Sequence, residues 1–271
     1  MSSSPPLAAP SELIEQFERG NVVLFCGAGI SISDGGLPSG WQLAKELAQR
    51  SGQDDISART LPDVAQAYEL ELGHQSLISY LTNRIEDPRF LPLRTHHLIA
   101  ALPFKAIITT NWDNLLEEAL RQSRKPFIKV VQDAEVAFAD NDKTLLVKLH
   151  GSMEQKDSIV IAGDDYYRVL TRLPETANLI RSYFATRTML FLGFGLADLD
   201  FKRLYIEVVD NLGRHKRRAY AVQRNTTATT IKYWREKNVE VIDADAADFL
   251  AVLKKQMGPA DQSSPRPEQG N

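Results

Sequence analysis

Seven short apolar runs alternate with segments of helical periodicity, and this order restricts the fold more than any other feature of the chain. The runs span residues 21–26, 105–109, 127–131, 144–149, 188–193, 217–223 and 239–242. The helical segments fit residues 11–19, 40–50, 113–122, 175–187, 198–211, 228–237 and 246–256. Such alternation is typical of a parallel sheet covered by helices. The order therefore predicts an α/β fold with helices on both faces of the sheet.

One stretch of the chain, residues 62–101, breaks this alternation. Leu77, Leu81 and Ile85 recur at helical spacing there, and no apolar run intervenes. We therefore expect a helical insertion over about residues 51–101 that forms a small second lobe.

Both ends of the chain offer little that a core could bury. Residues 1–10 hold three serines and three prolines, and residues 258–271 are mostly polar, Pro or Gly. Such segments predict a disordered N-terminus and a C-terminal disordered tail or linker stub. One domain is then expected over residues 11–257.

Charge and cysteine content exclude several classes of function. The net charge of −3 gives no reason to expect direct nucleic-acid binding. Cys26 is the only cysteine, so an intrachain disulfide and a multi-thiolate zinc site are excluded, and an inert core thiol is expected. No run approaches the ~18 apolar residues of a membrane span, and the N-terminus lacks the regions of a signal peptide. These features predict a cytoplasmic protein without a membrane partner.

A glycine pair follows the first apolar run. A strand that ends at Gly27-Ala-Gly29 lets the backbone approach a ligand that a Cβ would block, and the amides that follow can face a phosphate. The third glycine of the dinucleotide fingerprint is absent, because position 32 is Ile. From the pair alone, a structural turn and a nucleotide-binding loop both remain open.

The helix after this loop is expected to begin late. Ser39 can cap it, with Gln42 in the capping-box position. Residues 30–39 then form a loop long enough to cover a bound ligand.

Three further loops carry polar or glycine residues directly after predicted strands, at residues 109–113, 148–151 and 193–198. Ligands of open parallel sheets bind at that edge. Each loop also has a plainer interpretation, since Asn111 can cap a helix, His150 can be structural, and two glycines can form a turn. Four such loops on one edge favour a ligand site.

Taken together, these motifs resemble the sirtuin family. Gly27 to Ser31 looks like the pyrophosphate loop of that family, and Thr110 to Asp113 is similar to its Gln-Asn-Ile-Asp segment. His150-Gly151 is similar to its catalytic His-Gly, and Gly193 to Gly195 resembles its Gly-Thr-Ser or Gly-x-Ser segment. The motifs appear in family order and span residues 22 to about 223.

The resemblance implies a Rossmann-like NAD-binding domain with a smaller lobe over the nicotinamide end. By carry-over, Asn111 contacts the nicotinamide ribose and orders a water, Asp113 helps to bind the carboxamide, and His150 is the general base. The binding residues that it implies are Gly27, Ala28, Gly29, Ile30, Ser31, Thr110, Gly193, Phe194, Gly195 and Asp198.

Departures from the family pattern narrow the implied activity. Family deacylases carry a four-cysteine zinc module, which one cysteine cannot supply, so no zinc is expected. The covering loop, Gly36 to Trp41, lacks the Phe and Arg of deacylases, and Trp41 is a candidate to replace the aromatic. What remains resembles the zinc-free bacterial branch, whose members are NAD-cleaving effectors of anti-phage defence, often with a fused or partner sensor module.

The expected function is NAD+ hydrolysis to nicotinamide and ADP-ribose, or to a cyclic isomer, by an enzyme that forms a homo-oligomer. Three alternatives stay open: a module that binds NAD or ADP-ribose without cleavage, a protein deacylase or ADP-ribosyltransferase, and an oligomeric scaffold. A module that only binds NAD or ADP-ribose requires neither Asn111 nor His150. A deacylase or ADP-ribosyltransferase releases nicotinamide only when an acylated or acceptor peptide is present.

Overall fold

The computed structural model describes residues 7–32, 36–53, 55–57, 59–140, 142–209 and 217–258. Its centre is a seven-stranded parallel sheet with the order β3-β4-β2-β1-β5-β6-β7. The strands are β1 (Val22–Cys26), β2 (Ala106–Thr109), β3 (Phe127–Val130), β4 (Thr144–Lys148), β5 (Thr188–Leu192), β6 (Ala219–Val222) and β7 (Val239–Ile242). All seven predicted strands are confirmed. The five inner strands are buried at every residue, as parallel strands covered on both faces are, whereas the edge strands β3 and β7 are only partly buried.

The register of the sheet brings the ends of four strands level. Cys26 of β1 is paired with Thr109 of β2 on one side and with Leu192 of β5 on the other, and Thr109 is paired with Lys148 of β4. The chain runs from β1 to one side of the sheet for β2, β3 and β4, and then to the other side for β5, β6 and β7. The loops after β1, β2, β4 and β5 therefore surround the point of reversal, where open α/β sheets bind ligands.

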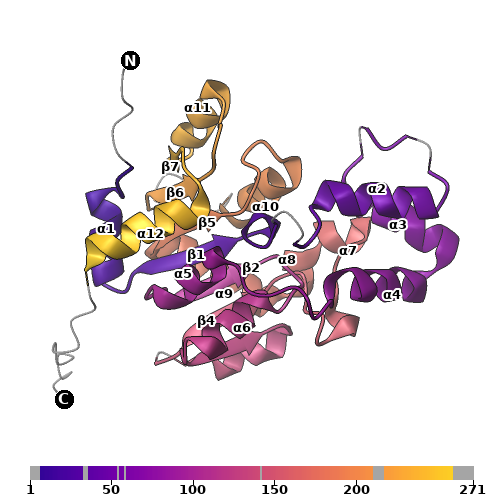
Figure 1. The fold of residues 1–271 in the computed structure, drawn as a ribbon, viewed down its shortest axis with the longest axis horizontal. Coiled ribbons are helices and arrows are strands. Elements are labelled where there is room, and N and C mark those ends of the chain that lie inside the picture. The colour runs from indigo at the N-terminus through magenta and orange to yellow at the C-terminus, as the bar shows by residue number, and fades with distance from the viewer. Residues whose placement is uncertain are drawn as a thin grey trace.

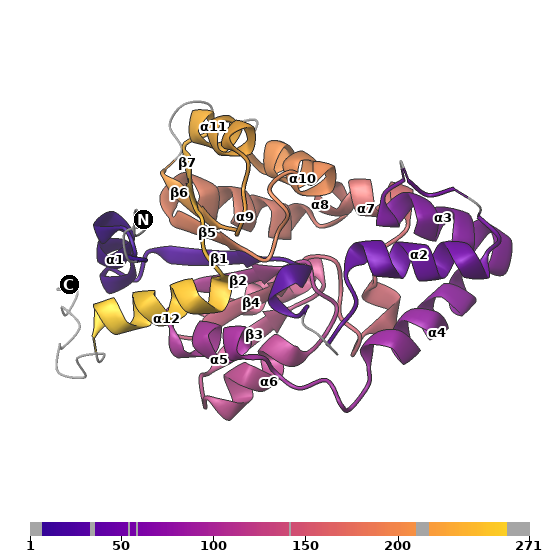
Figure 2. The ribbon, with the colours of Figure 1, turned by 45° about the horizontal axis from the view of Figure 1, so that its top comes forward.

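Helices cover both faces of the sheet, as Figures 1 and 2 show. One core contains residues of α1 (Ser11–Glu18), α5 (Arg94–Ala101), α6 (Leu115–Gln122) and α12 (Ala246–Met257). The other contains residues of α8 (Val169–Arg172), α9 (Pro174–Thr186), α10 (Leu199–Val209) and α11 (Ala228–Glu236). Alternate residues of β1 join the two cores, Val22 and Leu24 the first and Val23 and Phe25 the second, as side-chain alternation along a strand requires.

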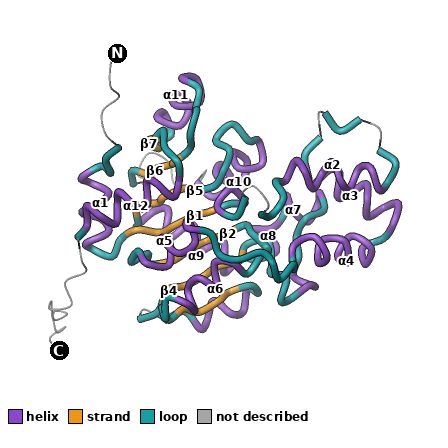
Figure 3. Tube along the Cα trace, viewed as in Figure 1, coloured by secondary structure: helices purple, strands orange, loops and turns teal. Residues whose placement is uncertain are grey.

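Three helices form a lobe at the end of the molecule far from α1 and α12 (Figures 1 and 3). They are α2 (Gly40–Arg50), α3 (Leu61–Leu72) and α4 (His74–Ile85), and they share a third hydrophobic cluster with Met153, Ile159 and Ile161 of the segment after β4. The predicted capping box of α2 is confirmed, since Ser39 Oγ accepts from the Gln42 N–H at 3.2 Å and Gln42 Oε1 accepts from the Ser39 N–H at 2.8 Å.

The structure differs from expectation at the far end of the insertion. Helix α5 lies within the range assigned to the lobe, yet it packs against α6 and α12, and its Ile99 belongs to the first core of the sheet. Helical periodicity indicates that one face of a helix is buried, but not which partner buries it. The short helices α7 (Gly163–Tyr167) and α8 were not predicted, because a few residues carry no readable period.

The N-terminal segment also differs from its prediction. Ala9 was expected to be disordered, but it is buried and its N–H donates to Gln256 Oε1 of α12 at 2.8 Å. Residues 1–6 and 259–271, which hold most of the predicted loose ends, lie outside the described residues. In the part of the chain that is described, no helix is long and apolar enough to cross a membrane.

Candidate active site

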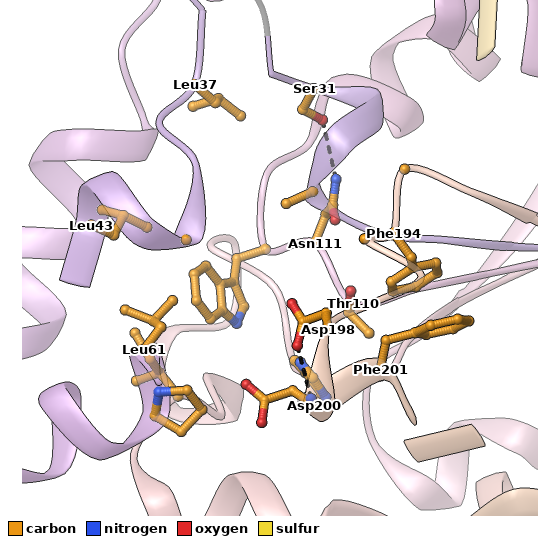
Figure 4. Close-up of a pocket in the computed structure, with 18 of the residues that line it drawn as sticks. Ser31, Leu37, Leu43, Leu61, Thr110, Asn111, Phe194, Asp198, Asp200 and Phe201 are labelled. Atoms are coloured by element: carbon orange, nitrogen blue, oxygen red, sulfur yellow. Dashed lines mark hydrogen bonds between the residues drawn. The ribbon is translucent and has the colours of Figure 1, made fainter. Parts of the chain in front are cut away.

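A cavity of about 220 Å³ lies between the carboxyl edge of the sheet and the small lobe. Figure 4 shows Leu37, Leu43 and Leu61 on one side and Phe194 and Phe201 on the other, with the polar groups between them. A second cavity of about 270 Å³, lined in part by α10, shares four lining residues with it. The shared residues are His150, Tyr166, Asp200 and Leu204.

Most of the residues predicted for a site line the first cavity. They are Ala28, Ser31, Thr110, Asn111, Asp113, His150, Gly193, Phe194, Gly195 and Asp198. Gly27, Gly29 and Ile30 do not line it. These residues lie on the loops after β1, β2, β4 and β5, which are separated by up to about 165 positions in the sequence. The register of the sheet brings the four loops together.

Gly27 and Gly29 contact another loop of the protein. A Cβ on Gly29 would lie 2.8 Å from the Gly193 carbonyl oxygen, and a Cβ on Gly27 would lie 2.5 Å from the Phe194 ring. Gly193 itself has a φ of +71° and meets the Gly27 carbonyl in return. The glycine pair is therefore required for close packing of the loops after β1 and β5, a reason that the sequence did not reveal.

Three of the amides in this loop are also occupied. The N–H of Gly29 donates to Gly193 O at 2.9 Å, that of Ile30 to Gly27 O at 3.2 Å and that of Ser31 to Ala28 O at 2.9 Å. The loop forms a single 3-10 turn, Ala28–Ile30, and α2 begins only at Gly40, after the predicted cap Ser39. A phosphate could reach these amides only by sharing them, so the predicted pyrophosphate role of the loop stays a prediction.

Ser31 connects two of the three residues predicted to be catalytic. Its hydroxyl accepts from Asn111 Nδ2, a contact of 3.1 Å that Figure 4 marks, and donates to Asp113 Oδ2 at 3.1 Å. Asn111 Oδ1 is buried without a hydrogen-bond partner, although buried polar atoms are rarely left so. Asn111 lines the cavity and its oxygen keeps an unused acceptor position, although almost none of the surface of that atom is open in this arrangement.

His96, on α5, was missed by the sequence analysis. It is fully buried, and its Nε2 lies 3.1 Å from Ser31 Oγ. No motif surrounds it, and it lies 65 positions from its partner, so only the fold brings the two together.

The Asp113 carboxylate contacts both the Ser31 hydroxyl at the cavity and the start of α6. One carboxylate oxygen accepts from Ser31 and the other from the Leu115 N–H at 3.1 Å, which caps the start of α6. Its carbonyl accepts from Lys148 Nζ, and the same ammonium lies 3.0 Å from Glu117 Oε1. Lys148 and Glu117 are both buried, so this ion pair holds the loop after β2 from beneath.

His150 lies 3% exposed at the junction of the two cavities, with its ring centroid 4.5 Å from that of Tyr166. Burial lowers its pKa from 6.5 to about 3. The imidazole is therefore neutral near pH 7 and keeps a lone pair, but the same burial makes it a weaker base than a solvated histidine.

Asp200 is the second residue that the sequence analysis missed. It lines both cavities, and its Oδ1 is buried without a hydrogen-bond partner. Burial, and then the nearby Asp198 carboxylate, raise the pKa of Asp200 to about 6. The Asp-x-Asp pattern directly after the Gly193 loop is the signal that could have drawn attention to it.

Trp41 does not take the place predicted for it. Its side chain is 65% exposed, and the Lys45 ammonium lies over its ring at 5.5 Å from the centroid. Trp112 lines the cavity instead, because it belongs to the loop after β2 rather than to the first turn of α2. Of the loop expected to cover a ligand, Leu37 and Pro38 line the cavity, and residues 33–35 lie outside the described residues.

Within the described ranges, no group of three or more His, Cys, Asp or Glu side chains could hold a metal ion. Cys26 is fully buried, and burial raises its pKa to about 12, so the thiol stays protonated and unreactive as predicted.

Comparison with known proteins identifies the family. Residues 105–242, about half of the chain, match the SIR2-like domain. The chain belongs to the SIR2-like family. The predicted resemblance to sirtuins is thereby confirmed, and the curated relatives agree with the bacterial branch that was predicted within it.

Two curated relatives are similar to this chain over most of its length. The chain is 29% identical over 222 residues to a protein named NAD(+) hydrolase ThsA from Enterococcus faecium, covering 78% of this chain and 44% of that protein. It is 27% identical over 247 residues to defense-associated sirtuin 2 from Bacillus subtilis, covering 86% of this chain and 24% of that protein. The chain thus spans less than half the length of these curated relatives.

Solved structures agree on the fold. A Sir2 homologue mutant in complex with ADP-ribose superposes with a TM-score of 0.56 at 14% identity, covering 92% of this chain and 96% of that one. A complex of a Sir2 homologue with NAD gives a TM-score of 0.55 at 13% identity, covering 92% and 93%. These likenesses confirm the predicted Rossmann-like architecture.

Proposed function

We propose that this protein is an NAD+ hydrolase that cleaves the bond between nicotinamide and ribose and acts in bacterial anti-phage defence. The observation that carries the proposal is the cavity on which Asn111 and His150 converge, one with an unpartnered acceptor and the other with a neutral imidazole. The names of the relatives, NAD(+) hydrolase and defense-associated sirtuin, support the same activity.

Several features of the cavity fit NAD+. It offers apolar walls from Phe194 and Leu61 with a small number of polar groups, and a second cavity adjoins it at His150. Asn111 Oδ1 can accept a hydrogen from water or from a ribose hydroxyl, and the Asp200 carboxylate favours a cationic centre in the cavity. In the proposal, the Gly193 to Gly195 loop and Ala28 flank the phosphates, and Asp113 lies at the carboxamide.

The proposed reaction needs no covalent intermediate with the enzyme. The C1′–N bond breaks with its electron pair on nicotinamide, which leaves as a neutral pyridine, and positive charge develops on the ribose. Water held by Asn111 Oδ1 forms the new C1′–O bond, and its proton passes to the His150 imidazole. If a ribose hydroxyl or the adenine of the same molecule attacked C1′ in place of water, the product would be cyclic.

The direct test is to incubate the purified chain with NAD+ and follow nicotinamide and ADP-ribose by proton NMR. NAD+ binding without cleavage, with or without candidate partner proteins, would instead favour a binding module. Nicotinamide release that requires an acylated peptide would favour a deacylase.

The proposal includes a homo-oligomer, a partner or fused sensor module and a cytoplasmic location. The length of the relatives beyond the matched region supports looking for such a module. Sizing by light scattering with and without NAD+ tests the oligomer.

Asp200→Asn is expected to stabilise the protein at pH 8 but not at pH 4. Since the pKa of Asp200 is raised from 3.8 to about 6, the folded state binds more protons than the unfolded state between these values. The free energy of unfolding therefore falls as the pH rises from 3.8 toward 6, and above pH 6 it stays at the lower value. Removing the carboxylate should recover about 1–2 kcal/mol at pH 8, less than the full linkage value because the group is partly solvated.

Urea unfolding of both proteins at the two pH values measures this difference. Asp157→Asn, which alters an exposed carboxylate, serves as the control and should leave stability unchanged at both. An Asp200→Asn variant that is less stable than the parent at pH 8 would contradict the prediction. Lower NAD+ turnover in the stabilised variant would indicate that the buried charge is kept for function.

A further inference from the structure

The hydroxyl of Ser31 uses all of its hydrogen-bonding capacity on three neighbouring side chains. Asn111 Nδ2, Asp113 Oδ2 and His96 Nε2 each lie 3.1 Å from its oxygen. A hydroxyl has one hydrogen to donate and two lone pairs to accept with. One of these neighbours must therefore be an acceptor and the other two must be donors.

The state of His96 decides this arrangement. Its Nδ1 accepts from the Leu93 N–H at 2.9 Å, so the hydrogen of the neutral ring is on Nε2, which then donates to Ser31 Oγ. The hydroxyl cannot donate back to His96, and it donates to the Asp113 carboxylate. The remaining lone pair accepts from the Asn111 amide nitrogen.

His96 also stays in this state as the pH changes. A second proton on Nδ1 would face the Leu93 N–H, and the ring is fully buried. Burial lowers the pKa of His96 to about 4, although Asp113 opposes this shift and His97 adds to it. Near neutral pH His96 is therefore a constant hydrogen-bond donor and not a pH switch.

We propose that His96 is a positioning residue that, through Ser31, holds the Asn111 amide with its oxygen toward the cavity. His96 does not line the cavity, so it acts only through the serine. An Asn111 oxygen in the cavity accepts a hydrogen from the attacking water and leaves a lone pair of the water free for C1′. A flipped amide would instead donate to the water oxygen, which occupies one of its lone pairs and makes it a weaker nucleophile.

This inference rests on the proposed hydrolase, and its test separates the two. His96→Phe keeps much of the ring volume but removes the donor, whereas His96→Gln keeps an N–H donor that reaches about as far as Nε2. His97→Phe, on the exposed face of the same helix, is the matched control. Each variant is assayed for kcat and KM with NAD+, for NAD+ affinity by calorimetry and for melting temperature.

We expect His96→Phe to lower kcat about 10- to 100-fold with KM and affinity within about threefold, because a small displacement of a catalytic group has effects of that size. His96→Gln should retain kcat within about fivefold, and His97→Phe should match the parent. Equal losses in the Phe and Gln variants that follow their melting temperatures would overturn the proposal, because a purely structural role predicts that pattern.

A measurement on the unmodified protein is independent of activity and of how the variants fold. Nitrogen-15 NMR of histidine-labelled protein should show the Nε2–H tautomer for His96, unchanged from pH 5.5 to 8. An Nδ1–H tautomer, or titration within that range, would overturn the proposal even in an active enzyme. If the tautomer is as expected and no condition gives NAD+ cleavage, the proposed function fails and the hydrogen-bond assignment stands.

Discussion

His150→Ala and Asn111→Ala should each lower NAD+ turnover by about 10²- to 10⁴-fold, the range that general-base and positioning groups contribute. His150 is the neutral imidazole at the junction of the two cavities, and Asn111 offers the unpartnered acceptor in the first. Neither supports the sheet, so the fold should survive both changes. Turnover is measured as nicotinamide release at saturating NAD+.

Two controls accompany these variants. His74→Ala removes an exposed histidine of α4 that pairs only with Glu69, so activity should match the parent. Circular dichroism and NAD+ calorimetry establish that the inactive variants remain folded and still bind. Full activity of either variant would eliminate the assignment of that residue.

Lys148→Met is expected to be the most destabilising change near the site. It leaves the Glu117 carboxylate, fully buried, without its cation, and breaking a buried pair by removal of one partner costs about 3–5 kcal/mol. It also removes the donor to the Asp113 carbonyl, which loosens the loop that carries Asn111. Urea unfolding measures the free-energy change.

The double variant Lys148→Met/Glu117→Leu isolates the cause. Replacing both charges with apolar groups leaves no unpaired ion, so most of the lost stability should return. Arg94→Met, which breaks the exposed pair with Asp248, should cost only about 0–1 kcal/mol. A double variant as unstable as Lys148→Met alone would indicate that the unpaired charge is not the cause.

Much of the chemistry of this protein is visible in short stretches of sequence. Unbroken apolar runs such as Val22–Cys26 indicate strands buried on both faces, and the Ser39 and Gln42 pair marks the start of α2. Asn111 and His150 were found because each follows such a run, and parallel strands present their carboxyl ends at a single edge. These inferences depend on neighbours in the sequence.

What the sequence analysis missed depends on distant partners. Trp41 is exposed although its position suggested a place in the cavity, and α5 packs on the sheet although its periodicity suited the lobe. Periodicity tells that a face is buried but not which element covers it. Asp200 likewise became notable only when the fold enclosed it.

By itself, the sequence determined the α/β fold, the order of the strands along the chain and the polar groups at their carboxyl ends, because residue period and chain direction are local properties. Only the tertiary structure decided that Gly27 and Gly29 serve loop packing, and that His96 reaches Ser31. Close backbone approach and the direction of a hydrogen bond are properties of pairs far apart in sequence, and they exist only after the chain has folded.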